Sequence, residues 1–222
     1  MSIYDLLKAF HILLFVFWLG TDIGVFYMGL MVQNQGYDPK TRMALAEAMH
    51  FLDQFPRTCL ILMIPVGIAL ARLGGFAFAE VSGEVLWAIA LLAVVWAVAS
   101  VLVTGFGSFQ KARSVFLVAD RAYRLVLVVL AVFVIGKTLG GEGLIAGRWL
   151  VFKVALFATI LLAGAIIDFL PNPFAALLEI GREGSTPQRE EALRRGLTLI
   201  YPVVVYIYLA LVAMLLLSVT RI

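Results

Sequence analysis

The chain has 222 residues, of which 63% are hydrophobic and only 14% are charged. Its mean hydropathy of +1.04 excludes a soluble domain with an ordinary polar surface. The net charge of +3 and the pI of about 9.1 fit the basic residues of cytoplasmic loops, and no nucleic-acid-binding patch is present. A single cysteine, Cys59, excludes an internal disulfide and a Cys-pair metal site.

Six apolar runs separated by Gly, Pro and polar residues predict an all-α fold, a polytopic membrane bundle of about six transmembrane helices in one domain, 1–222. The expected spans are roughly 6–33, 42–73, 85–107, 122–140, 147–169 and 197–219. Between the last two spans, a polar stretch from Glu179 to Arg195 is expected to hold a surface helix with Pro187 in its first turn.

The distribution of Lys and Arg predicts the orientation in the bilayer. Eleven of the 17 lie in loops and helix ends that face away from the N-terminal side, and six lie on the N-terminal side. The richer side is assigned to the cytoplasm, which places both termini in the periplasm of a bacterial inner membrane. Arg121 and Arg124, at the start of the fourth span, are interpreted as topology determinants that touch anionic lipid.

The first span contains the most informative residue of the chain. His11 lies in the run AFHILLFVFWLGTDIGVFYMGLMV, from Ala9 to Val32. A charged side chain there costs roughly 2.5 kcal/mol or more, so His11 is expected to be neutral and to ligate haem iron or another metal. Asp22 lies eleven residues later, close to three helical turns, and shares this face with Phe15 and Trp18. Two ionisable groups on one stripe of a spanning helix indicate a functional site.

A second polar stripe precedes the apolar part of the second span. It consists of Glu47, His50, Gln54 and Arg57, spaced by three, four and three residues. If the first two spans form a tight hairpin, Asp22 falls level with His50 and Asp53, and Asp22, His50, Asp53 and Arg57 form one buried polar cluster. The alternative is an amphipathic helix in the membrane interface, with His50 exposed to water.

The same hairpin places His11 level with Met63, roughly 16 Å from His50. One haem held between the two histidines is therefore disfavoured, and two separate sites, or one haem and one structural histidine, fit better. Met63 is a feasible second axial ligand, although packing is the commoner role of such a methionine. Glu47-x-x-His50 has the ligand spacing of di-iron bundles, but a complete site needs two such motifs.

Basic residues near the expected outer face offer a partner for an anionic cofactor. Lys153 lies about one turn inside Trp149, an interfacial anchor. It is expected to pair with a haem propionate above an iron that is ligated by His11. The alternative is that Lys153 extends to the interface like many lysines near helix ends.

Three segments are similar to known haem-binding membrane proteins. KAFHILLFVFWLG, with His11 followed by Trp18, resembles the first helix of the copper-resistance D family and of the J-type protoporphyrinogen oxidases of bacteria. MHFLDQFPRTCLILMIPVGIAL is similar to their second helix, and RWLVFKVAL resembles their Trp-x-x-x-Lys motif through Trp149 and Lys153. The resemblance implies a helical bundle that binds haem b, with His11 as an axial ligand and Lys153 near the porphyrin. Gln33 and Asn34 stand where the oxidases have a further histidine.

These observations lead to one expected function and two alternatives. The expected function is haem b binding in electron transfer to or from quinone or a partner protein, by a chain that lies in the bilayer and can form homo-oligomers. The first alternative, implied by the resemblance, is an enzyme that oxidises a porphyrin. The second is a haem-free, proton-coupled transporter of a solute or metal ion. Asp22, Asp53 and Arg57 are the expected catalytic residues. The transporter would move its solute or ion through the cluster of Asp22, His50, Asp53 and Arg57.

Overall fold

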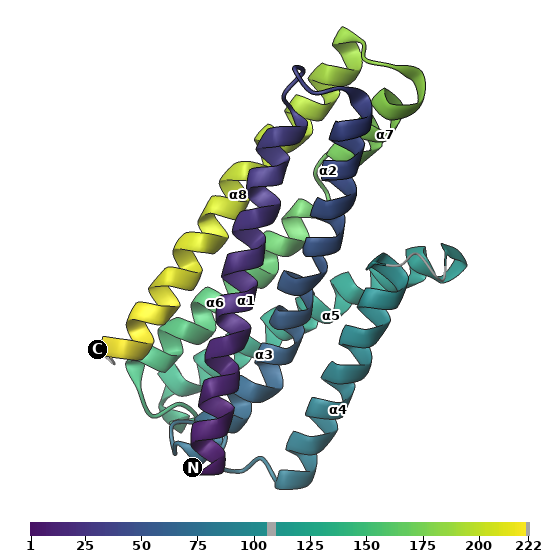
Figure 1. The fold of residues 1–222 in the computed structure, drawn as a ribbon. Helices are drawn as coiled ribbons and strands as arrows, with labels where there is room; N and C mark the ends of the chain where they lie inside the picture. The colour runs from purple at the N-terminus through teal and green to yellow at the C-terminus, as the bar shows by residue number, and fades with distance from the viewer. Residues whose placement is uncertain (106–109, 221–222) are drawn as a thin grey trace.

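The structure, a computed structural model, describes residues 1–105 and 110–220, and it confirms the all-α membrane bundle (Figure 1). Six helical segments within these ranges are long and apolar enough to cross a bilayer. The helices are α1 (Ile3–Val32), α2 (Pro39–Leu52), α3 (Gln54–Leu73), α4 (Gly83–Ser100), the π-helical η1 (Val101–Gly105), α5 (Gln110–Lys137), the π-helical η2 (Thr138–Glu142), α6 (Arg148–Ile167), α7 (Pro173–Glu183) and α8 (Pro187–Thr220).

Side-chain caps define several helix starts. Ser2 and Asp5 form a capping box at the start of α1. Asp38 caps α2, and its carboxylate accepts hydrogen bonds from the backbone N–H groups of Lys40 and Thr41. Proline follows the cap in α2 and in α7, where its missing N–H and fixed φ suit the first helical turn. The local sequence therefore determines where these helices begin.

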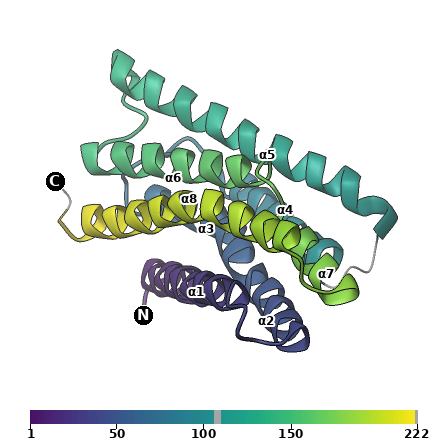
Figure 2. The ribbon, with the colours of Figure 1, turned by 90° about the horizontal axis from the view of Figure 1, so that it is seen from above.

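The central core lies between α1, α3, α6 and α8. Its buried residues are Leu14, Trp18, Cys59, Met63, Val66, Ile160, Ala163, Ile207, Ala210, Leu211 and Met214. Viewed from above, α1 and α5 lie on opposite sides of the bundle, with α8 and α6 between them (Figure 2). Helix α4 packs against α3 and leaves large apolar side chains exposed along its length, as expected for a surface that faces lipid.

A smaller cap layer covers the end of the bundle opposite the two termini (Figure 1). It joins α2, α7 and the first turns of α8 around Val32, Ala46, Leu177, Ile180 and Leu193, among others. The expected surface helix with Pro187 in its first turn is in fact the beginning of α8, which runs unbroken into the last span. Helix α7 was not expected from the sequence, because Pro171 and Pro173 flank its start.

Two other boundaries differ from the expected spans. The second span consists of two helices, because Asp53 ends α2 and begins α3. The fourth span begins at Gln110 rather than near residue 122, so the polar segment before Arg121 is helical as well. At the opposite end of the bundle, Ala77 pairs with Ile145 in an isolated antiparallel bridge that joins the α3–α4 and α5–α6 connections.

Candidate functional site

His11 lies inside the bundle, against helix α3. Its Cε1 atom is 3.9 Å from the position that a Cβ atom at Gly67 would occupy, so the ring lies against this part of α3 and leaves room there for no side chain larger than a methyl group. The Nδ1 atom of His11 is buried and has no hydrogen-bond partner among the described residues. A buried polar nitrogen without a hydrogen-bond partner is unfavourable. The Nδ1 atom is therefore available to bind a group that the polypeptide does not supply.

Lys153, on α6, is within electrostatic range of His11. Its Nζ atom donates a hydrogen bond of 2.8 Å to the hydroxyl of Ser218 on α8 and lies 5.9 Å from the centroid of the Trp149 ring. No carboxylate pairs with Lys153 in the described part of the chain. The structure therefore places His11 and an unpaired ammonium group near one another between α1, α6 and α8.

Trp18 and Met63 fill the central core between α1 and α3. Their side chains are 3% and 7% exposed, respectively. Met63 lies one helical turn before Gly67, so His11 faces α3 about one turn beyond the level that the simple hairpin predicts.

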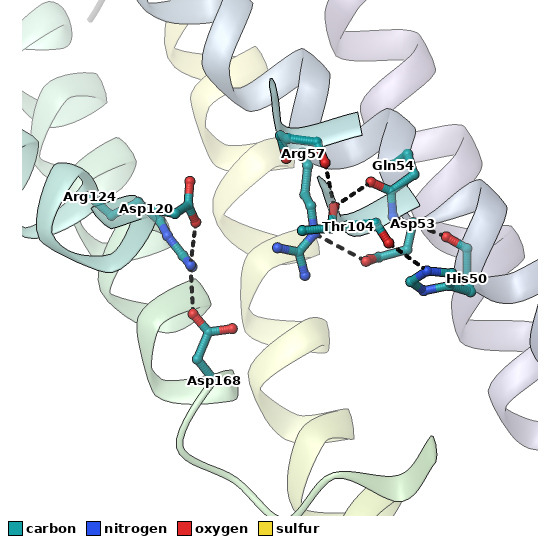
Figure 3. A network of polar contacts seen from close by, with 9 residues as sticks. His50, Asp53, Gln54, Arg57, Thr104, Asp120, Arg124 and Asp168 are labelled. Carbon is teal, nitrogen blue, oxygen red and sulfur yellow. Dashed lines mark hydrogen bonds and ion pairs between the residues drawn. The ribbon is translucent and has the colours of Figure 1, made fainter. Parts of the chain in front are cut away.

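His50 is held by the π-helical segment η1 (Figure 3). Its Nε2 atom lies 2.8 Å from the carbonyl oxygen of Thr104, and because a carbonyl oxygen only accepts, Nε2 is the donor. The Thr104 hydroxyl donates to the side-chain oxygen of Gln54 at 2.9 Å, and the Gln54 amide donates to the His50 carbonyl at 3.2 Å. These bonds tie α2 and α3 to η1, and they occupy the Nε2 atom of His50.

Asp53 and Arg57 form an ion pair of 3.2 Å, with about a third of each side chain exposed. Asp22 lies within electrostatic range of Asp53, in agreement with the hairpin. The register is supported by Gly24, where an added Cβ atom would lie 3.8 Å from Leu52. The structure thus brings Asp22, Asp53 and Arg57 into one neighbourhood, while His50 turns to Thr104. The guanidinium group of Arg57 pairs with Asp53 rather than with Asp22.

A second group of charges, which the sequence interpretation missed, lies across from Arg57 (Figure 3). Arg124 on α5 is 8% exposed and contacts Asp120 at 2.7 Å and Asp168 at 2.6 Å. The expected contact of Arg124 with anionic lipid is wrong, because its side chain is buried and pairs with two carboxylates of the protein. Arg121 also pairs with Asp168, at 3.5 Å. Arg57 lies within electrostatic range of both Asp120 and Asp168.

Two local features make this second group possible. An added Cβ atom at Gly164 would lie 3.2 Å from a terminal nitrogen of Arg124, so this glycine on α6 leaves room for the guanidinium group. The indole N–H of Trp96 on α4 donates to Asp120 at 3.0 Å. The Asp120–Arg124 spacing of four residues is the sequence signal that would have indicated a pair on one helical face.

Within residues 1–105 and 110–220, no three His, Cys, Asp or Glu side chains are grouped so that they could hold a metal ion by themselves. Comparison with known proteins adds no relative: no protein-family model, no curated protein and no solved structure matches the chain.

Proposed function

We propose that this multi-pass membrane protein binds haem b through His11 and uses it in electron transfer with quinone or a redox partner protein. The observation that carries the proposal is the Nδ1 atom of His11, which is buried and unpartnered inside a spanning helix. A neutral imidazole in an apolar environment is a common axial ligand of haem iron. Haem, when bound, would supply a one-electron redox couple.

The surroundings of His11 are compatible with a flat, anionic cofactor. Gly67 presents no side chain toward the imidazole ring, and Lys153 is a cation without a carboxylate partner in the described ranges. Its ammonium group would neutralise a propionate, because an unpaired anion inside the bilayer is unfavourable. Met63, one turn before Gly67 on α3, offers a thioether donor. The resemblance of the His11 and Trp149–Lys153 segments to haem-binding membrane families supports the same assignment.

The charge distribution supports an inner-membrane location with both termini in the periplasm. Two arginines of the richer side, Arg42 and Arg124, are buried inside the protein. Without these two, nine basic residues remain on that side. On the terminal side, five remain when Lys153, which lies within α6, is left out. The excess of Lys and Arg on the α2–α7 side persists, which favours that side as the cytoplasmic one.

The test is the visible spectrum of the protein, purified in detergent and reconstituted with haem b. We expect a Soret band, and α and β bands that appear on reduction, in the wild type. His11→Ala should abolish or strongly shift these bands. His50→Ala is the matched control and should retain them, because the Nε2 atom of His50 is bound to Thr104.

Gly67 provides an independent check of the site. Gly67→Ala places a methyl group 3.9 Å from the imidazole, an ordinary contact distance, and should leave the spectrum unchanged. Gly67→Leu should perturb it, because the larger side chain occupies the space beside the ring. An unchanged spectrum in both His11→Ala and Gly67→Leu would show that haem, if bound, lies elsewhere.

A further inference from the structure

The charged groups near Asp22 do not balance. Four carboxyl groups and three guanidinium groups of the described residues lie in electrostatic contact across α1, α3, α5 and the end of α6. They are Asp22, Asp53, Asp120 and Asp168, and Arg57, Arg121 and Arg124. If every group is ionised, one negative charge has no counter-charge. Inside a helical bundle such an excess charge is unfavourable, so it is removed by a cation or by a proton.

The ion pairs show which carboxyl group is left over. Arg57 contacts Asp53, Arg124 contacts both Asp120 and Asp168, and Arg121 contacts Asp168. None of the three arginines forms an ion pair with Asp22. The three guanidinium groups therefore match the other three carboxylates, and the excess charge belongs to Asp22.

The groups that face Asp22 do not compensate it. At the α2–α3 junction it faces Asp53, which already forms an ion pair with Arg57. From α8 it faces Tyr208, whose hydroxyl donates a hydrogen bond of 2.7 Å to the main-chain carbonyl of Asp22 rather than to its carboxyl group. His50 lies three residues before Asp53, but its Nε2 proton is donated to the carbonyl oxygen of Thr104. The Asp22 carboxyl group thus has a like charge on one side and no donor from the described side chains.

We propose that Asp22 is a proton-binding site within the membrane bundle. The carboxyl group is protonated at neutral pH when Asp53 is ionised, and it exchanges its proton on the side of the bundle where α2 and α7 lie. Asp22 is ten residues from the end of α1 on that side, and Asp168, which follows α6, belongs to the same network. A spanning-helix carboxyl group of this kind is the element that pumps and transporters use to carry a proton. The site does not depend on haem.

Dicyclohexylcarbodiimide provides a direct test, because this apolar reagent modifies protonated carboxyl groups inside membrane proteins. We expect mass spectrometry of the treated wild type at neutral pH to find the adduct on Asp22, and not on Asp53, Asp120 or Asp168. Labelling should decrease as the pH rises, since the reagent needs the protonated acid. Glu47→Gln, which removes an exposed acid of α2, is the matched control and should leave the labelling of Asp22 unchanged.

The competing outcomes are distinct. Protection of Asp22 by sodium chloride, but not by choline chloride, would overturn the proposal in favour of a bound sodium ion. Absence of an adduct on Asp22 at every pH would overturn it in favour of an ionised carboxylate. The melting temperature of Asp22→Asn gives a second measure. It should equal or exceed that of the wild type, because no ion pair is lost, and a lower value would show that Asp22 has an ionic partner.

Discussion

Arg42 and Glu190 form a bidentate ion pair that joins α2 to the start of α8. The two terminal nitrogens of Arg42 contact the two carboxylate oxygens of Glu190 at 2.7 and 2.9 Å, and the Nε atom donates to the carbonyl oxygen of Val32 at 2.7 Å. The Arg42 side chain is 2% exposed. One arginine thereby satisfies a carbonyl group at the end of α1 and links three segments that are far apart in the sequence.

Removal of one member of this pair should destabilise the cap layer. Arg42→Met leaves the Glu190 carboxylate and the Val32 carbonyl without their partner, and we expect a loss of about 3–5 kcal/mol in the free energy of unfolding. The double variant Arg42→Met/Glu190→Leu should recover much of this loss. Chemical unfolding in detergent measures both values. Lys40→Met, at an exposed position in the first turn of α2, is the control. A loss in Lys40→Met as large as that in Arg42→Met would contradict the assignment.

Lys153 should matter more for cofactor retention than a lysine at the membrane surface. Lys153→Met removes the unpaired ammonium group near His11, so haem should dissociate faster on dilution. Lys137→Met is the matched control, because Lys137 is 40% exposed and pairs with Glu142. The measurement is the rate at which the Soret band is lost to an excess of apomyoglobin. Equal rates for the two variants would show that Lys153 does not bind the cofactor and only anchors α6 at the membrane interface.

Arg57 should couple to Asp53 rather than to Asp22. The Asp53–Arg57 pair has a spacing of four residues and is about one-third exposed, so the expected coupling energy is below about 1 kcal/mol. A double-mutant cycle with Arg57→Ala and Asp53→Ala measures it. The cycle with Asp22→Ala should give a value near zero. A larger coupling energy for Asp22 than for Asp53 would show that Arg57 pairs with Asp22 instead.

The cap of α2 should make the stability depend on acid pH. Hydrogen bonds from the Thr41 hydroxyl and from the backbone N–H groups of Thr41 and Lys40 lower the pKa of Asp38 below its usual value. A lowered folded-state pKa means that Asp38 stabilises the fold above its unfolded pKa of about 3.9, and that this contribution is lost as the pH falls through the lowered value. The melting temperature of Asp38→Ala should therefore lie below that of the wild type at pH 7, and the two should converge once the pH is below the lowered pKa of Asp38. A constant difference across this range would contradict the prediction.

Apolar periodicity predicted the number of spans and the fold class, because a long apolar run satisfies its backbone groups in the bilayer only as a helix. Hairpin geometry also predicted the neighbourhood of Asp22 and Asp53. The partners of Arg124 and Arg42 were not predicted, since Asp168 and Glu190 lie 44 and 148 residues away along the chain. Such pairings depend on which helices become neighbours, and apolar residues of similar size carry little information about that choice. The haem assignment of His11 stays a prediction.

Helix α8 makes a side-chain contact at nearly every level of the bundle. Glu190 holds Arg42 at the cap layer, Tyr201 meets Gln33, Tyr208 meets Asp22, and Ser218 accepts the hydrogen bond of Lys153. At 1.5 Å per residue, its 34 residues make a rod about 51 Å long, and Pro202 removes one backbone hydrogen bond within it. The two ends of the bundle are thereby joined through one helix, since the same α8 that holds Arg42 at the cap layer also accepts the hydrogen bond of the lysine near His11 at the opposite end.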